Sequence, residues 1–397
     1  MQNSAAQRIV VTAGKLKTPD ENEITVILKG QAWLGWADMT LTRSLETCPP
    51  VFTLSVYDLD DDTRFPAVPG DPIEVWIGPW KGHPGNQLLT GYIDRLQTQV
   101  SPNSRSLTIV GRGKTQDLVD CSARWKGGQI VSSSVLETAR KLAEPFGITV
   151  AGVPGPAVGS GKVIPYKCIM VGERAFTVIE ELCRIAAIIP VELPDGSLYL
   201  CPSPGVKDDE QFTFAQTASG FAEGVNVQSA AMLTSADGRY SEVAAHRQSF
   251  DGMRDLGNFD AVNTIVTVKD PAVKRYRPFD FVMELGRAMA IENADRRAHW
   301  EVARRWGRGF RLSLTTDTWR DSAGALYEVN KLAHVQLPKL GVPDDFWLIA
   351  EVTFKAHPKT GRTCDLVLMP PAAFFVQPTL PYANLPADIA GLAINRH

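Results

Sequence analysis

A block of alternating apolar and polar residues occurs twice in this chain of 397 residues. The first copy contains PGDPIEVWIG, LLTGYIDRLQTQV and LTIVGRG, and the second contains VNKLAHVQLP, WLIAEVTFKAH and CDLVLMPP. In each copy a turn with Pro, Gly, Ser or Asn separates the last two strings, a pattern typical of a β-hairpin with one buried face. One offset aligns Leu89 with Leu348, Ile93 with Val352, Leu107 with Leu366 and Ile109 with Leu368, and a one-residue shift aligns Val75 with Val335 and Ile77 with Leu337.

A true duplication and a shared general pattern both explain this likeness. Any sheet with one buried face imposes a period of two, so that unrelated amphipathic hairpins resemble each other. If the duplication is real, the chain carries two similar sheet domains, and the number of copies becomes a clue to symmetry.

Composition describes an ordinary folded protein. Hydrophobic residues make up 44% and charged residues 21% of the chain, values typical of globular domains. The net charge of −3 argues against a general binder of polyanions. The sequence shows no apolar run long enough for a membrane helix and no secretory signal. The six cysteines are scattered and predict reduced thiols in a chain made in a cytosol. Two disulfide pairs are the alternative interpretation.

The pattern changes along the chain divide it into five parts and predict a mainly β fold with α+β portions. Residues 1–115 form a first β domain, 116–205 a small mixed α/β domain, 206–240 with 310–375 a second β domain, 241–309 an inserted segment, and 376–397 a Pro-interrupted C-terminal arm. The arm either binds a partner or is a frayed tail.

Two helices and a hairpin are predicted in the mixed domain. Ser134 and Glu137 have the spacing of a capping box before an apolar helical stripe that stops at Gly147. A second helix follows Gly172 and is predicted to end at Pro190. After it, VELPDGSLYLCP predicts a hairpin.

The inserted segment carries the strongest charge cluster. The cluster consists of Arg287, Arg296, Arg297, Arg304, Arg305, Arg308 and Arg311, against Glu292, Asp295 and Glu301. It fits a solvated helix face with internal ion pairs, a contact with an acidic partner subunit, or a contact with nucleic acid. The pairs Arg297–Glu301 and Glu301–Arg305 have helical spacing. Trp300 and Trp306 on the same segment favour a protein interface.

Motifs for chemistry are absent or incomplete. GPAVGSGKV has the wrong spacing for a phosphate loop, and the hydroxyl that binds magnesium is replaced by Val163. Asp58, Asp60 and Asp62 have calcium-loop spacing, but the required glycine and glutamate are missing. The sequence therefore predicts no catalytic, cofactor-binding or metal-binding residue.

Several strings resemble the baseplate hub proteins of Mu-like contractile-tailed phages, which are related to the myophage hub and to the base of type VI spikes. They include LTIVGRGKTQDLVDCSARW, GERAFTVIEELCRIAAIIPVELPDGSLYL and TWRDSAGALYEVNKLAHVQLPKLGVPDDFWLIAEVTF, in the family's order. The resemblance covers nearly all of 8–375, whereas 241–309 matches only in general character.

The resemblance implies two tail-tube-like β-barrel domains and a homotrimer in a virion tail baseplate. Such a ring would adapt a six-fold tail tube to a three-fold central spike, contact baseplate wedge proteins and let DNA pass, with no enzymatic activity and no membrane contact. It would be assembled in the bacterial host cytoplasm. The alternatives are a tail-associated peptidoglycan hydrolase and the hub part of a type VI-like injection spike.

Overall fold

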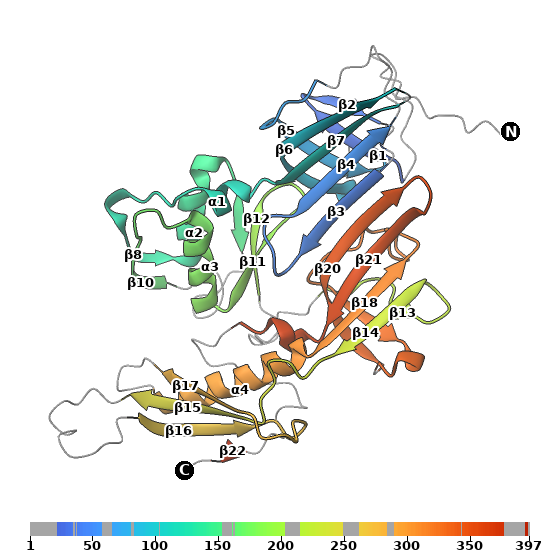
Figure 1. Cartoon of the computed structure of the whole chain (residues 1–397). Helices are drawn as coiled ribbons and strands as arrows, with labels where there is room; N and C mark the ends of the chain where they lie inside the picture. Colours follow the sequence, from blue (N-terminus) through green and yellow to red (C-terminus); the bar gives the residue numbers. More distant parts are fainter. Residues whose placement is uncertain are drawn as a thin grey trace.

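A computed structural model gives the fold of most of the chain. It describes residues 22–34, 36, 38–57, 66–80, 83–102, 104–152, 161, 163–202, 215–248, 262–283, 290–342, 344–376 and 394–395. The fold is mainly β, as predicted, and one large sheet dominates it (Figure 1). No described helix is long and apolar enough to cross a membrane.

Seven strands make the first β unit. They are β1 (Ile24–Leu28), β2 (Gln31–Trp33), β3 (Asp38–Ser44), β4 (Val51–Tyr57), β5 (Pro72–Ile77), β6 (Gln87–Ser101) and β7 (Ser104–Gly113). All neighbours are antiparallel, in the order β3-β4-β7-β6-β5-β1-β2. The alternation of Ile24, Val26 and Leu28 predicts one buried face, but every residue of β1 is buried, including Thr25.

Six strands make the second β unit. They are β13 (Phe221–Ala222), β14 (Ser229–Thr234), β18 (Phe310–Thr316), β19 (Leu332–Gln336), β20 (Asp345–His357) and β21 (Gly361–Met369). The alternation of Val225 and Val227 in the sequence predicts a strand, but Val225 lies in a turn and Val227 makes only an isolated bridge. Phe212 and Phe214, whose alternation also predicts a strand, lie outside the described residues.

The two units form one sheet of thirteen strands, because β20 pairs with β3. In Figure 1 the orange-red β20 and β21 lie beside the blue β3 and β4. The main strand path starts at β14 and stops at β2, so that the pairings of the described residues do not close a barrel. One hydrophobic cluster extends through both units.

The mixed α/β part follows the first β unit and has its own core. It contains α1 (Gln116–Asp120), β8 (Gln129–Ser134), α2 (Val135–Ala143), β9 (Val150–Gly152), β10 (Val163–Cys168), α3 (Ala175–Ile185), β11 (Ile188–Glu192) and β12 (Leu198–Pro202). The capping box is confirmed, since the Glu137 N–H donates to Ser134 Oγ at 3.1 Å and the Ser134 N–H donates to the Glu137 carboxylate at 3.2 Å. The hairpin of β11 and β12 is also confirmed. However, α3 ends at Ile185, and Pro190 lies within β11.

The segment between the halves of the second unit forms a separate layer. It contains β15 (Glu242–Gln248), β16 (Val262–Lys269), β17 (Pro278–Met283) and α4 (Ala290–Arg308). The helix was predicted, but the three strands were not. Of the C-terminal arm, only Val376 and β22 (Ile394–Asn395), which pairs with β16, are described. Short 3₁₀ helices, η1 (Pro84–Asn86), η2 (Lys126–Gly128), η3 (Glu144–Phe146), η4 (Pro338–Leu340) and η5 (Pro371–Phe374), complete the described structure.

Candidate assembly interface

The two copies of the repeated block fold into the same bulged hairpin. In β6 and β7 a bulge lies between Ile93 and Arg95, and seven residue pairs follow before the turn. In β20 and β21 a bulge lies between Ile349 and Glu351, and again seven pairs follow. Bulges are specific local features that fix register. We therefore treat Arg95 and Glu351 as corresponding residues.

This correspondence corrects part of the alignment derived from the sequence. With the bulges superposed, the counterpart of Leu348 is Tyr92 and not Leu89, and the counterpart of Leu366 is Ile109 and not Leu107. One offset could not fit both strands, because two residues separate Ser101 from Ser104 whereas three separate His357 from Gly361. The alignment of Val75 with Val335 agrees with the observed register, since β5 and β19 pair with matching positions of β6 and β20.

The internal joint between the units is the β20–β3 pairing. Six pairs connect the strands, from Glu351 with Ser44 to Ala356 with Met39. On one face Leu41 and Phe354 are fully buried. Because the joint combines backbone pairing with a buried apolar face, it holds the units as one body.

The other face of this sheet is rich in hydroxyl groups. At the joint, Thr42 Oγ1 and Thr353 Oγ1 are 3.0 Å apart. Within the first unit, Ser55 and Thr108 are hydrogen bonded at 3.0 Å. In the second unit, the Thr315 hydroxyl donates to Asp365 at 2.9 Å. A polar face therefore extends from one unit to the other, opposite the common core.

A buried carboxylate connects the mixed part to the first unit. Glu192, at the end of β11, accepts hydrogen bonds from the Lys114 N–H at 3.0 Å, the Thr115 N–H at 3.1 Å and the Thr115 hydroxyl. Arg43 in β3 donates to the Glu192 carbonyl at 2.8 Å. Burial raises the pKa of the Glu192 carboxyl to about 7, although these donors act in the opposite direction. This residue was not predicted from the sequence. Its signal was a lone carboxylate inside the apolar string IIPVEL.

Glu192 should make stability depend on pH. In the folded protein the Glu192 carboxyl keeps its proton until the pH approaches its pKa of about 7, whereas the ordinary pKa of a glutamate carboxyl is 4.5. The unfolded chain therefore binds fewer protons between these values, and stability falls as pH rises. Relative to the Glu192→Gln variant, we expect the wild type to lose about 3 kcal/mol of unfolding free energy across this window and nothing further above it. Urea titrations of both proteins between pH 4.5 and 8 measure this difference, and parallel pH profiles would contradict it.

The arginine-rich helix α4 is partly a core element. Ala298 and Val302 are buried in the cluster that the helix forms with β15 and β16. The predicted internal ion pairs are confirmed, because Arg297 and Arg305 both bind Glu301, at 2.8 and 2.9 Å. Of the remaining cluster, Arg287 lies outside the described residues.

A tryptophan of α4 serves the chain's own core. Trp300 is 5% exposed and donates from Nε1 to the Phe375 carbonyl at 2.7 Å. The expectation that this residue marks an interface is therefore wrong, because its ring and its polar atom are already satisfied within the chain.

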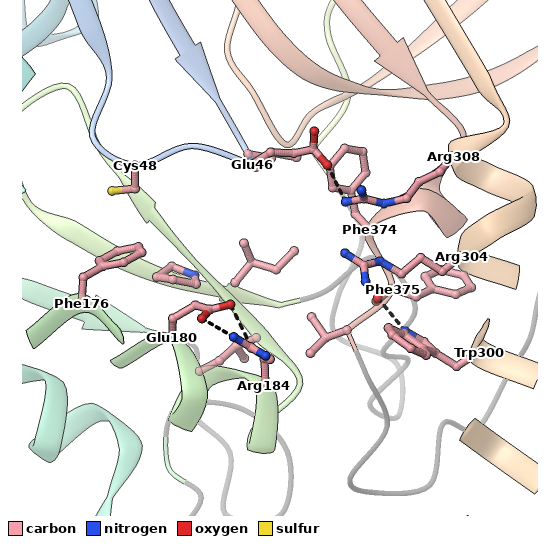
Figure 2. Close-up of a pocket in the computed structure, with 15 residues that line it drawn as sticks. Glu46, Cys48, Phe176, Glu180, Arg184, Trp300, Arg304, Arg308, Phe374 and Phe375 are labelled. Carbon is pink, nitrogen blue, oxygen red and sulfur yellow. Dashed lines mark hydrogen bonds and ion pairs between the residues drawn. The ribbon is translucent and has the colours of Figure 1, made fainter. Parts of the chain in front are cut away.

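A cavity of about 650 Å³ lies between α3, α4, η5 and the loop after β3 (Figure 2). At its walls Arg308 pairs with Glu46, and Arg184 pairs with Glu180. Arg304 makes no ion pair within the described part of the chain, and its buried Nε has no hydrogen-bond partner there. Burial lowers the pKa of the Arg304 guanidinium. Aromatic side chains of α3, α4 and η5 line the cavity beside these arginines.

Groups for metal or redox chemistry do not gather in the described structure. No three His, Cys, Asp or Glu residues are placed to hold a metal among the described residues. All six cysteines are free thiols, as predicted. The Asp58–Asp62 turn lies outside the described residues, as does nearly all of the glycine-rich loop at 155–163.

Three family models match consecutive parts of the chain. Residues 23–113 match the N-terminal domain of the Mu phage baseplate assembly protein GpP-like family. Residues 115–201 match the second domain of baseplate hub protein gp44-like. Residues 290–377 match the fourth domain of Mu phage baseplate assembly protein GpP. These matches confirm the resemblance identified from the sequence.

Individual proteins show the same likeness. Baseplate hub protein gp44 of Escherichia phage Mu is 24% identical over 358 residues, 89% of each chain. The 43 kDa tail protein of prophage MuSo2 from Shewanella oneidensis has a TM-score of 0.74 and 24% identity, over 89% of this chain and 99% of that one. The E. coli c3393 protein, a component of the type VI secretion system, has a TM-score of 0.53 and 9% identity, over 89% of this chain and 79% of that one. The two solved structures share the fold.

Proposed function

We propose, from its relationship over most of its length to the baseplate hub proteins of Mu-like phages, that this chain is a structural hub of a contractile phage or prophage tail. In this proposal three copies form a ring in the virion baseplate, assembled in the bacterial host cytoplasm. The hub has no catalytic role, in keeping with the structural names of its relatives.

The observation that carries the proposal is the repeated bulged hairpin within one sheet. Two corresponding units per chain give six similar positions in a ring of three chains. Units that meet head to tail form a closed ring only when the rotation between neighbours divides a full turn. The two units of each chain are already joined covalently, so every second joint of the ring is fixed. The ring can then meet a six-fold tail tube on one side and a three-fold spike on the other. Tail tube, central spike and baseplate wedge proteins are the proposed partners.

The domain division follows from this arrangement. We propose that residues 1–115, and 206–240 with 310–375, supply the two tube-like barrels, which ring formation would complete. The parts at 116–205, 241–309 and 376–397 are placed outside the ring-forming units. Three separate hydrophobic clusters agree with this division, because the mixed part and the α4 layer each bury their own core.

The hydroxyl-rich face of the sheet is the proposed lining for DNA in transit. A strongly basic surface would hold phosphates through the release of counterions. This face instead carries threonines and serines, and its Lys355 is paired with Asp365 at 2.5 Å. A lining without excess positive charge lets DNA pass without retaining it.

The mass of the assembled particle tests the proposal. We expect the purified chain, alone or with its spike protein, to give a species of about 130 kDa, three times the chain mass of 43.4 kDa. Mass photometry at several concentrations measures it. A strictly monomeric protein, even with the spike present, would overturn the trimeric hub. A peptidoglycan zymogram tests the hydrolase alternative, since clearing that is lost on replacing one acidic residue would favour an enzyme.

A further inference from the structure

We infer that the ring closes through a second sheet joint, between the outer edge of β6 in one chain and β14 in the next. This inference rests on the proposed function and specifies the surface through which two copies meet. It follows from the topology. β6 corresponds to β20 through the bulged hairpins. β14 corresponds to β3, because β14 pairs with β18 and β18 with β21, just as β3 pairs with β4 and β4 with β7.

The register of the new joint can be transferred from the internal one. In the internal joint Thr353 lies opposite Thr42, and Phe354 opposite Leu41. The correspondence of the strands replaces the first pair by Gln97 and Leu233 and the second by Thr98 and Met232. Each predicted pair keeps the face of its counterpart, since Met232 packs against the common core as Leu41 does.

Both edges are unpaired in the part of the chain that the structure describes. Among the described residues no strand pairs with the outer edge of β6 beyond Tyr92 or with the outer edge of β14. Val100 is 76% exposed, whereas its counterpart Ala356 in the internal joint is 7% exposed. Leu233 is 60% exposed.

These edges also lack the usual protection against pairing. Edge strands of soluble proteins carry lysine, proline or inward-pointing charges that prevent addition of another strand. The sequence of β14, SAAMLT, has no charged residue and no proline, and the outer half of β6, RLQTQVS, has a single arginine. An unprotected edge of this length would aggregate unless a specific partner covers it, and the corresponding edge of a second copy fits in register.

The two kinds of joint differ in strength. Phe354 and Leu41 are fully buried in the internal joint, whereas their counterparts are the smaller, polar Thr98 and the flexible Met232. Less apolar area is then removed from water between chains than within a chain. The joints between chains are therefore the weaker ones, so the ring would separate into folded single chains before any chain unfolds.

Disulfide trapping in the full chain tests the inferred register. The double variant Gln97→Cys/Leu233→Cys places thiols where the internal joint has two threonine oxygens 3.0 Å apart, a geometry compatible with a disulfide. After mild oxidation we expect covalent dimers and trimers on non-reducing gels, about ten-fold more than in either single variant. The single variants measure the background of links that form through the six native thiols.

Two matched variants make the result specific. Thr42→Cys/Thr353→Cys should form a disulfide within the chain and shows that the oxidation works on this sheet. Gln97→Cys/Thr234→Cys moves one thiol to the opposite face, because neighbouring strand residues alternate, and should not link chains.

The outcomes separate this inference from the proposed function. Links between chains in the first double variant alone support the inferred joint. A trimer in mass photometry without such links, while the internal control forms, would overturn the joint and leave the hub proposal intact. A chain that never forms a trimer would overturn both.

Discussion

Replacing Leu366 with Asp is expected to destabilise the protein by about 4 kcal/mol or more, a large fraction of the stability of a typical domain. Leu366 is 1% exposed and lies in β21, between β18 and β20. A carboxylate at this position loses its hydration. The protein also loses the packing contacts of the leucine side chain. Thermal and urea unfolding measure the loss, together with the soluble yield.

The first unit supplies a second site for the same experiment, although the positional counterpart of Leu366 there is Ile109 and not Leu107. Leu107 in β7 is 6% exposed, and Leu107→Asp should cost a similar amount because it enters the same cluster from the first unit. Ser106→Asp is the matched control, since Ser106 is only partly buried on the neighbouring face. The native Asp365, next to Leu366, shows that a carboxylate is tolerated on the polar face. Wild-type stability of both leucine variants would mean that these strands do not share a buried face.

Local patterns predicted the elements that depend on local chemistry. The capping box at Ser134 and the helix stop at Gly147 follow from hydrogen bonds and backbone angles within a few residues. The i, i+4 ion pairs around Glu301 likewise depend only on helical spacing.

Features that depend on tertiary contacts were missed or misplaced. The turns of the two hairpins differ in length by one residue, so a single offset could not align both strands of each hairpin. Burial of Thr25 on the second face of β1 depends on strands distant in sequence. The sheet of β15 to β17 was missed because its strands alternate weakly and a parallel pair, β15 with β17, joins segments far apart.

The same distinction applies to the candidate interface. The repeat suggested two similar units, but only the pairing of β20 with β3 shows how one unit meets the next. The carboxylate of Glu192 gains its environment from Thr115 and Arg43, which lie far away in sequence. Long-range contacts of this kind leave only a weak sign in one sequence, here a single polar residue within an apolar string.

Gly91→Val should be the most damaging change at a residue without a side chain. Gly91 in β6 pairs with Gly113 in β7. A Cβ atom at Gly91 would lie 2.0 Å from the carbonyl oxygen of Arg112, which belongs to the backbone and cannot rotate away. The strands would have to separate, so we expect a loss of about 4 kcal/mol, above the usual cost of overpacking, and a sharp fall in the unfolding midpoint.

The control for this variant is Gly85→Ala. Gly85 lies in η1, where an added Cβ meets nothing within 4 Å, so the change should stay within about 0.5 kcal/mol of the wild type. Gly91→Val also displaces Gly113, the strand partner of Gly91. Gly113 precedes Lys114, and the Lys114 N–H donates to Glu192. The variant should therefore lose the pH dependence of stability assigned to Glu192 as well as stability itself. A variant that is destabilised but keeps that pH dependence would show that the close pairing of Gly91 with Gly113 and the buried carboxylate of Glu192 are independent.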